Sequence, residues 1–125
     1  PSHTVVGYFI GSPGMNVLPA SIEGSEVHVG AEIIRLPVAP KIAAGARAEL
    51  GIRPEYVRLG REGMPVRITK VEDIGRQKIV RAEFAGQAIA MILAEDGEVP
   101  AEPKITFAPE GINIYANSWR VGTEG

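Results

Sequence analysis

Apolar and polar residues alternate at every second position in several short segments of this chain. Between Arg47 and Arg53, the residues Ala48, Leu50 and Ile52 share one side, whereas charged residues and Gly51 occupy the other. This period of two is that of a β-strand with one face on a hydrophobic core. Comparable strands are predicted at residues 15–23, 26–29, 32–36, 66–74, 78–85, 88–94, 104–108 and 112–116.

Turn-forming residues separate these segments. The chain has 15 glycines and 10 prolines among 125 residues, dispersed between the apolar runs. Short strands joined by tight turns pair in antiparallel fashion. We therefore expect an all-β fold, a small OB-like antiparallel barrel with additional strands. Residues 37–45 and 59–65 are predicted loops, and residues 94–103 an exposed connection.

Two irregularities are predicted within the strands. The alternation slips between Ile68 and Val71, and a β-bulge near residues 69–70 would return both side chains to the core. Pro54 ends the strand that precedes it, because proline has no amide hydrogen to donate. Arg53 and Glu55 flank this corner. They form a local ion pair that holds the strand end or, alternatively, Arg53 binds a substrate.

The chain divides into an arm (residues 1–14), a β domain (15–118) and a polar C-terminal tail (119–125). The arm contains large apolar residues at positions 5, 6, 8, 9 and 10, which need a cover from this domain or from another one. The β-branched residues and Gly7 make this segment a poor helix on its own, so a strand is the local alternative.

Composition excludes several classes of site. The chain lacks cysteine, so neither a disulfide nor a thiolate metal site can form. His3 and His28 lie in separate segments and make a weak metal site, so no metal is expected. The net charge of −2, with both signs interspersed, argues against a nucleic-acid partner. No Gly-Lys pair, no Gly-x-Ser-x-Gly motif and no convergent pair of carboxylates is present, so we expect no catalytic residue and no bound cofactor.

Three blocks resemble a known family. The run Gly51-Ile52-Arg53-Pro54-Glu55 is similar to a signature of the C-terminal region of ABC-importer ATP-binding subunits of the maltose and glycerol-3-phosphate type. Two further blocks, at residues 9–16 and 71–75, resemble that family in the same order. The matching positions are Gly11, Ser12, Pro13, Met15, Asn16, Gly51, Ile52, Arg53, Pro54, Glu55, Glu72 and Gly75.

This resemblance implies a TOBE domain with a short N-terminal helical arm, preceded by an ATPase domain ahead of Pro1. It implies ATP and Mg²⁺ for that ATPase domain and none for the present residues. The implied partners are a second ATP-binding subunit in a homodimer, membrane permease subunits reached through the ATPase domain, and a cytosolic regulator. The implied location is peripheral, on the cytoplasmic face of the bacterial inner membrane. The run from Ile112 to Trp119 departs from the Leu-Phe-Asp-like end of the family, which weakens any transfer of function there.

A regulatory and dimerisation module is therefore the leading hypothesis, and a small-ligand sensor for an oxyanion or solute is the alternative. A docking module needs an apolar patch with a polar rim. Candidates are Ile89, Met91 and Leu93, or their alternates Ala88, Ala90 and Ile92, together with Tyr115 and Trp119. The added strands of the domain could equally cover this apolar segment from within.

Overall fold

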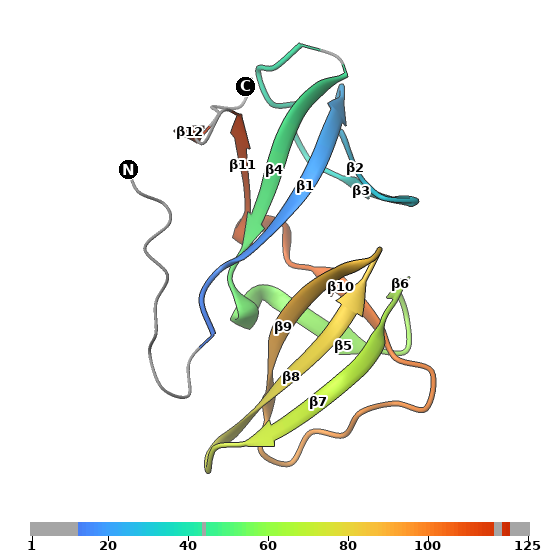
Figure 1. Cartoon of the computed structure of the whole chain (residues 1–125), viewed down its shortest axis with the longest axis vertical. Coiled ribbons are helices and arrows are strands. Elements are labelled where there is room, and N and C mark those ends of the chain that lie inside the picture. The colour runs from blue at the N-terminus through green and yellow to red at the C-terminus, as the bar shows by residue number, and fades with distance from the viewer. Residues whose placement is uncertain (1–12, 44, 117–118, 121–125) are drawn as a thin grey trace.

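The computed structural model describes residues 13–43, 45–116 and 119–120, and this part of the chain is built from β-strands and two short 3₁₀ turns. The predicted all-β class is thereby confirmed. The predicted helical arm lies outside the described residues. Figure 1 shows one group of strands above another along the longest axis of the molecule.

The upper strands form one six-stranded antiparallel sheet. Its strands in chain order are β1 (Asn16–Glu23), β2 (Glu26–Val29), β3 (Glu32–Arg35), β4 (Ala46–Ile52), β11 (Ile112–Ala116) and β12 (Trp119–Arg120). Their spatial order is β12-β11-β4-β1-β2-β3. Pro19 pairs only with β4, since β1 meets β2 at Ser21–Glu23 alone, so this proline has a strand on one side only.

The lower strands form two three-stranded sheets. One has the order β5-β10-β6 and the other the order β7-β8-β9 (Figure 1). Their bounds are β5 (Val57–Gly60), β6 (Met64–Pro65), β7 (Arg67–Asp73), β8 (Gln77–Phe84), β9 (Gln87–Ala94) and β10 (Lys104–Phe107). The hairpin of β8 and β9 turns through Ala85 and Gly86, which have φ values of 49° and 80°. Positive φ at both central residues is what a two-residue hairpin turn with the strand twist requires.

One continuous antiparallel ribbon connects the upper and lower strands. Ile52 faces Ile112 in the upper sheet, and Val57 faces Phe107 in the lower one, so both strands advance by five residues between these pairs. The turns η1 (Pro54–Tyr56) and η2 (Pro109–Gly111) lie where this ribbon passes from the upper to the lower strands. The Ala108 amide donates to the Tyr56 carbonyl at 2.9 Å, and this bond keeps the two strands of the ribbon in register between the turns.

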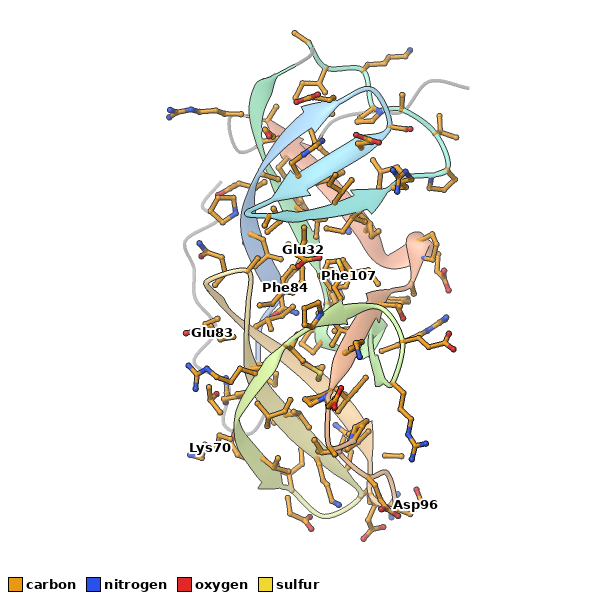
Figure 2. All side chains as sticks on the ribbon, turned by 90° about the vertical axis from the view of Figure 1, so that its right-hand side faces the viewer. Glu32, Lys70, Glu83, Phe84, Asp96 and Phe107 are labelled. Carbon is orange, nitrogen blue, oxygen red and sulfur yellow. The ribbon has the colours of Figure 1, made fainter. Side chains whose placement is uncertain are left out.

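A single hydrophobic cluster extends through both groups of strands. It includes Leu18, Leu50 and Ile105, each 0% exposed. The rings of Phe84 and Phe107 meet edge to face, 5.7 Å apart, and Figure 2 shows them at mid-height, where upper and lower strands adjoin. Burial of side chains of this size stabilises a fold by about 1.5–3 kcal/mol each.

The structure differs from the sequence-based prediction at three places. Residues 57–60 and 64–65 form strands β5 and β6, although most of this stretch was expected to be a loop. The bulge between Ile68 and Lys70 is present, but Val71 beyond it stays 45% exposed because β7 is an edge strand. Residues 119–120 extend the sheet as β12, where a tail was expected.

Candidate functional site

Asn16 belongs to the first of the three blocks that resemble the family (residues 9–16, 51–55 and 71–75), which we call the signature blocks. Its side chain connects the upper sheet to β9, one of the lower strands, which together we call the lower barrel. It is 7% exposed, and its side-chain amide donates to the carbonyls of Ile52 (3.0 Å) and Ala90 (2.9 Å). The Ala90 amide donates back to Asn16 Oδ1 at 2.8 Å. The side chain thus satisfies both backbone groups of Ala90, as a neighbouring strand would. The resemblance identified Asn16, but this role has no signal in the strand pattern alone.

Gly51, from the second signature block, lies beneath two side chains. A Cβ built on Gly51 would stand 2.7 Å from the Tyr115 ring and 3.1 Å from the Met15 thioether. The Tyr115 hydroxyl contacts the Met15 sulfur at 3.9 Å. A side chain at position 51 would therefore push Tyr115 or Met15 away from β4.

This arrangement creates an exposed apolar area that we call the Gly51 patch, formed by Met15, Val17, Gly51 and Tyr115. Val17 is the direct cross-strand partner of Gly51. Val17 is 46% exposed and Met15 is 37% exposed. The patch brings together Met15 and Gly51, which the signature predicted, with Tyr115, a predicted interface residue. Sequence reasoning missed Val17, whose signal is an apolar residue on the outward side of an alternating strand.

The corner after β4 is a rigid turn without the expected ion pair. Pro54 is buried and opens η1, and the Tyr56 amide donates to the Arg53 carbonyl at 3.0 Å. Arg53 and Glu55 are both exposed, and neither joins an ion pair in the part of the chain that the structure describes. The local ion pair is therefore a wrong prediction, because the 3₁₀ turn is closed by backbone bonds and directs both charges to solvent.

The third signature block, residues 71–75, lies apart from the first two, at the end of the edge strand β7. The Gly75 amide donates to the Asp73 carboxylate at 2.9 Å, and the φ of 105° at Gly75 requires glycine there. Glu72 accepts a 2.8 Å hydrogen bond from Arg81 and lies 3.6 Å from Lys70. The hydrogen bond from Arg81 holds the pKa of Glu72 below its ordinary value, and the charges of Arg81 and Lys70 act in the same direction.

Two of the predicted interface residues belong to the core instead. Ile89 is 4% exposed and Met91 is 0% exposed, because their side of β9 faces the central cluster. Leu93 is half-buried against the same cluster. The domain itself covers this side, so Ile89 and Met91 cannot form a docking patch. Gly11, Ser12 and the side chain of Trp119 lie outside what the structure describes, and Pro13 is half-buried.

Two further groups of polar residues lie at the surface of the described chain. A shallow hollow on β5 and β10 is lined by Arg58, Leu59, Gly60, Arg61, Glu62 and Thr106. His28 is partly exposed and contacts Glu26 at 3.3 Å. Within residues 13–43, 45–116 and 119–120, no three His, Asp or Glu side chains converge as a metal site would need. None of the helices in the described chain has the length and hydropathy to span a membrane.

Two family models match the chain, and they overlap where the ribbon passes from the upper to the lower strands. The MalK OB fold domain matches residues 11–57, which include the strands β1 to β4. The TOBE domain matches residues 50–105, which include β5 to β9. The overlap at residues 50–57 is the signature run with the turn η1. Residues 11–57 therefore belong to the MalK OB fold domain family and residues 50–105 to the TOBE domain family.

Curated relatives of this OB/TOBE chain are ABC transporter ATP-binding proteins. An sn-glycerol-3-phosphate import ATP-binding protein UgpC 2 of Agrobacterium fabrum is 33% identical, covering 100% of this chain and 36% of the relative. A UgpC of Chromobacterium violaceum is 35% identical, covering 75% of this chain and 27% of the relative. An ABC transporter ATP-binding protein y4oS of Sinorhizobium fredii is 30% identical over 87% of this chain and 30% of its own length. The chain therefore spans about a third of the length of these relatives.

Among solved structures, the OB/TOBE chain is similar to the cytoplasmic molybdate-binding protein ModG with molybdate bound. The TM-score is 0.65, and the match covers 86% of this chain and 98% of ModG. The sequence identity is 14%, so the likeness concerns the fold.

Proposed function

We propose that this chain acts as the C-terminal regulatory and dimerisation domain of the ATP-binding subunit of an ABC importer. The imported solute is glycerol 3-phosphate, another polyol or a sugar. In this proposal the fragment has no catalytic role, and ATP and Mg²⁺ bind in an ATPase domain encoded ahead of Pro1. That domain engages permease subunits at the cytoplasmic face of the bacterial inner membrane. The names of the relatives and the third of their length that this chain spans support the proposal.

The Gly51 patch is the observation that best supports the proposed regulatory and dimerisation role. Met15 and Val17 are exposed there and Tyr115 is half-buried, and the patch is assembled from two signature blocks, β1 and β11. The charged residue Glu49 borders it, since Glu49 lies two residues before Gly51 on β4 and pairs with Tyr115. An exposed apolar area with a polar rim is typical of a protein interaction surface. A second copy of this domain is the partner that we propose.

Self-association of the chain tests this proposal. Sedimentation velocity from micromolar to millimolar concentration should show a monomer–dimer equilibrium, because the patch is apolar and preformed. Val17→Arg should abolish the dimer by placing a charge at the centre of the buried area. Val38→Arg is the matched control, since Val38 is 40% exposed in the loop after β3, away from the patch residues.

Two results would contradict the dimerisation role. One is a wild-type chain that stays monomeric at every concentration. The other is a dimer that Val17→Arg leaves intact, or that the control variant weakens equally.

The second candidate function is sensing of a small oxyanion or solute. It is favoured by the hollow on β5 and β10, where Arg58 and Arg61 lie beside Thr106. Arg58 is only loosely paired with Glu110, at 3.8 Å, so its donors remain largely available to an anion. Calorimetry with sulfate, molybdate and glycerol 3-phosphate tests it. Stoichiometric heat that Arg61→Ala removes would support sensing, and the absence of heat from all three ligands would contradict it.

A further inference from the structure

The thioether of Met15 is held at the surface of the Gly51 patch by two neighbours. A Cβ built on Gly51 would stand 3.1 Å from both the sulfur and the terminal methyl group of Met15. The Tyr115 hydroxyl donates to the same sulfur at 3.9 Å. The strands β4 and β11, which carry Gly51 and Tyr115, lie side by side (Figure 1). The sulfur is thus bounded by β4 beneath it and by Tyr115 beside it, and a reagent approaches it from solvent.

Met15 is also the most accessible oxidisable sulfur in this chain. The sequence has three methionines and no cysteine, the residue that would be oxidised first. Met15 is 37% exposed, whereas Met91 is 0% exposed and Met64 is half-buried against the central cluster. An oxidant must touch the sulfur that it oxidises, so it reacts at Met15 in preference to the other two methionines.

We propose that Met15 is a site of reversible oxidation by peroxides, and that its sulfoxide dissociates the dimer. This inference rests on the dimerisation role proposed above. In the reaction a lone pair of the Met15 sulfur attacks one oxygen of hydrogen peroxide, an S–O bond forms and the O–O bond breaks. The departing hydroxide takes the proton of the transferred oxygen and leaves as water. The sulfur loses two electrons, and the peroxide gains them.

The position of the sulfur determines where the new oxygen points. Because β4 and Tyr115 bound the other sides, the oxygen is added on the side of solvent, which a docked second copy would cover. Oxidation replaces an apolar thioether by a polar acceptor, and burial of such an acceptor without a donor is unfavourable. The Tyr115 hydroxyl is the one side-chain donor among the patch residues. A single hydroxyl does not replace all the water that burial takes from a sulfoxide oxygen.

Oxidation and dimerisation of the chain therefore oppose each other. The sulfur of Met15 is accessible in the monomer and covered in the dimer, so peroxide reacts with the monomer. The oxidised monomer then binds a second copy more weakly, and the monomer–dimer equilibrium shifts towards the free chain. Enzymatic reduction of the sulfoxide restores the thioether and with it the apolar surface.

Peptide mapping by mass spectrometry after treatment with hydrogen peroxide tests the site. An added oxygen should accumulate at Met15 at least about tenfold faster than at Met64 or Met91, because the reagent must reach the sulfur. The rate at Met15 should fall as the protein concentration rises through the dissociation constant of the dimer, while the slow rates at Met64 and Met91 stay constant.

Sedimentation velocity of the same samples tests the consequence. Oxidation of Met15 should raise the dissociation constant of the dimer by about tenfold or more. Treatment with a methionine sulfoxide reductase and dithiothreitol should reverse this change. In Met15→Leu the dissociation constant, whatever its value before treatment, should not respond to peroxide. Met64→Leu is the matched control, which should respond as the wild-type chain does.

The possible failures are distinguishable. A wild-type chain that is monomeric before any peroxide is added contradicts the dimerisation role itself. Oxidation that is no faster at Met15 than at Met64 or Met91 overturns the assignment of the site. A dimer that survives complete oxidation of Met15, or a Met15→Leu dimer that peroxide still dissociates, overturns the proposed effect while the dimerisation role stands.

Discussion

Replacement of Asn16 by alanine should be among the most damaging single substitutions in the domain. The side chain makes three hydrogen bonds of 2.8–3.0 Å, two with Ala90 and one with Ile52. It is 7% exposed, so little water reaches these groups. Asn16→Ala removes the bonds and leaves the Ala90 amide and carbonyl without this partner.

The magnitude follows from the three bonds. Each intramolecular hydrogen bond contributes about 0.5–1.5 kcal/mol net, and an unsatisfied buried group costs about 1–3 kcal/mol. We therefore expect Asn16→Ala to lower the free energy of unfolding by about 3 kcal/mol. With an unfolding entropy of about 2.1 cal/mol/K per residue, this corresponds to a fall in Tm of roughly 10 °C.

Urea denaturation followed by circular dichroism measures this loss. Asn113→Ala is the matched control, because Asn113 has the same side chain but makes one long bond of 3.4 Å, to the Gly111 carbonyl. It should cost less than about 1 kcal/mol. The reasoning would be refuted if Asn16→Ala shifted the urea midpoint no more than the control, since the clamp between the upper sheet and β9 would then add nothing to stability.

Two further predictions concern charged residues of the signature blocks. Arg53→Ala should change the free energy of unfolding by no more than about 0.5 kcal/mol, because Arg53 is exposed and has no ion pair in the described chain; a larger loss of stability in the same urea assay would contradict this. Glu72 should titrate below its ordinary pKa in a carbon-detected NMR experiment, because Arg81 bonds its charged form. Since the folded pKa is lowered, the stabilising effect is present above the unfolded pKa of Glu72 and is lost as the pH falls through the folded value. Arg81→Ala should raise the midpoint of Glu72, and an unchanged midpoint would contradict the assigned cause.

Strands with a clean alternation could be predicted from the sequence, because one buried face determines which residues are apolar. The segment at 78–85 became β8, and the slip near residue 69 became a bulge in β7. Strands β5 and β6 could not be predicted this way. They are short and contain Gly60 and Pro65, which indicate a loop when read locally, and only pairing with the distant β10 makes them strands.

The candidate site was predicted only in part. The resemblance selected Asn16 and Gly51, but their roles depend on residues far along the chain: Ala90 for Asn16 and Tyr115 for Gly51. No local pattern carries such long-range information. Conversely, the apolar run at 88–94 indicated an interface, although Met91 is enclosed by the core of its own domain.

The continuous ribbon through η1 and η2 makes the lower barrel an insertion within the upper sheet. The chain leaves β4 after Ile52 and returns to it at Ile112, its direct partner, so entrance and exit are adjacent. A tight hairpin could join these two residues without shifting the pairing above. Insertions in the lower strands can thus be accommodated without shifting the pairing of β4 with β11, provided that the hydrophobic cluster shared by both groups of strands stays filled.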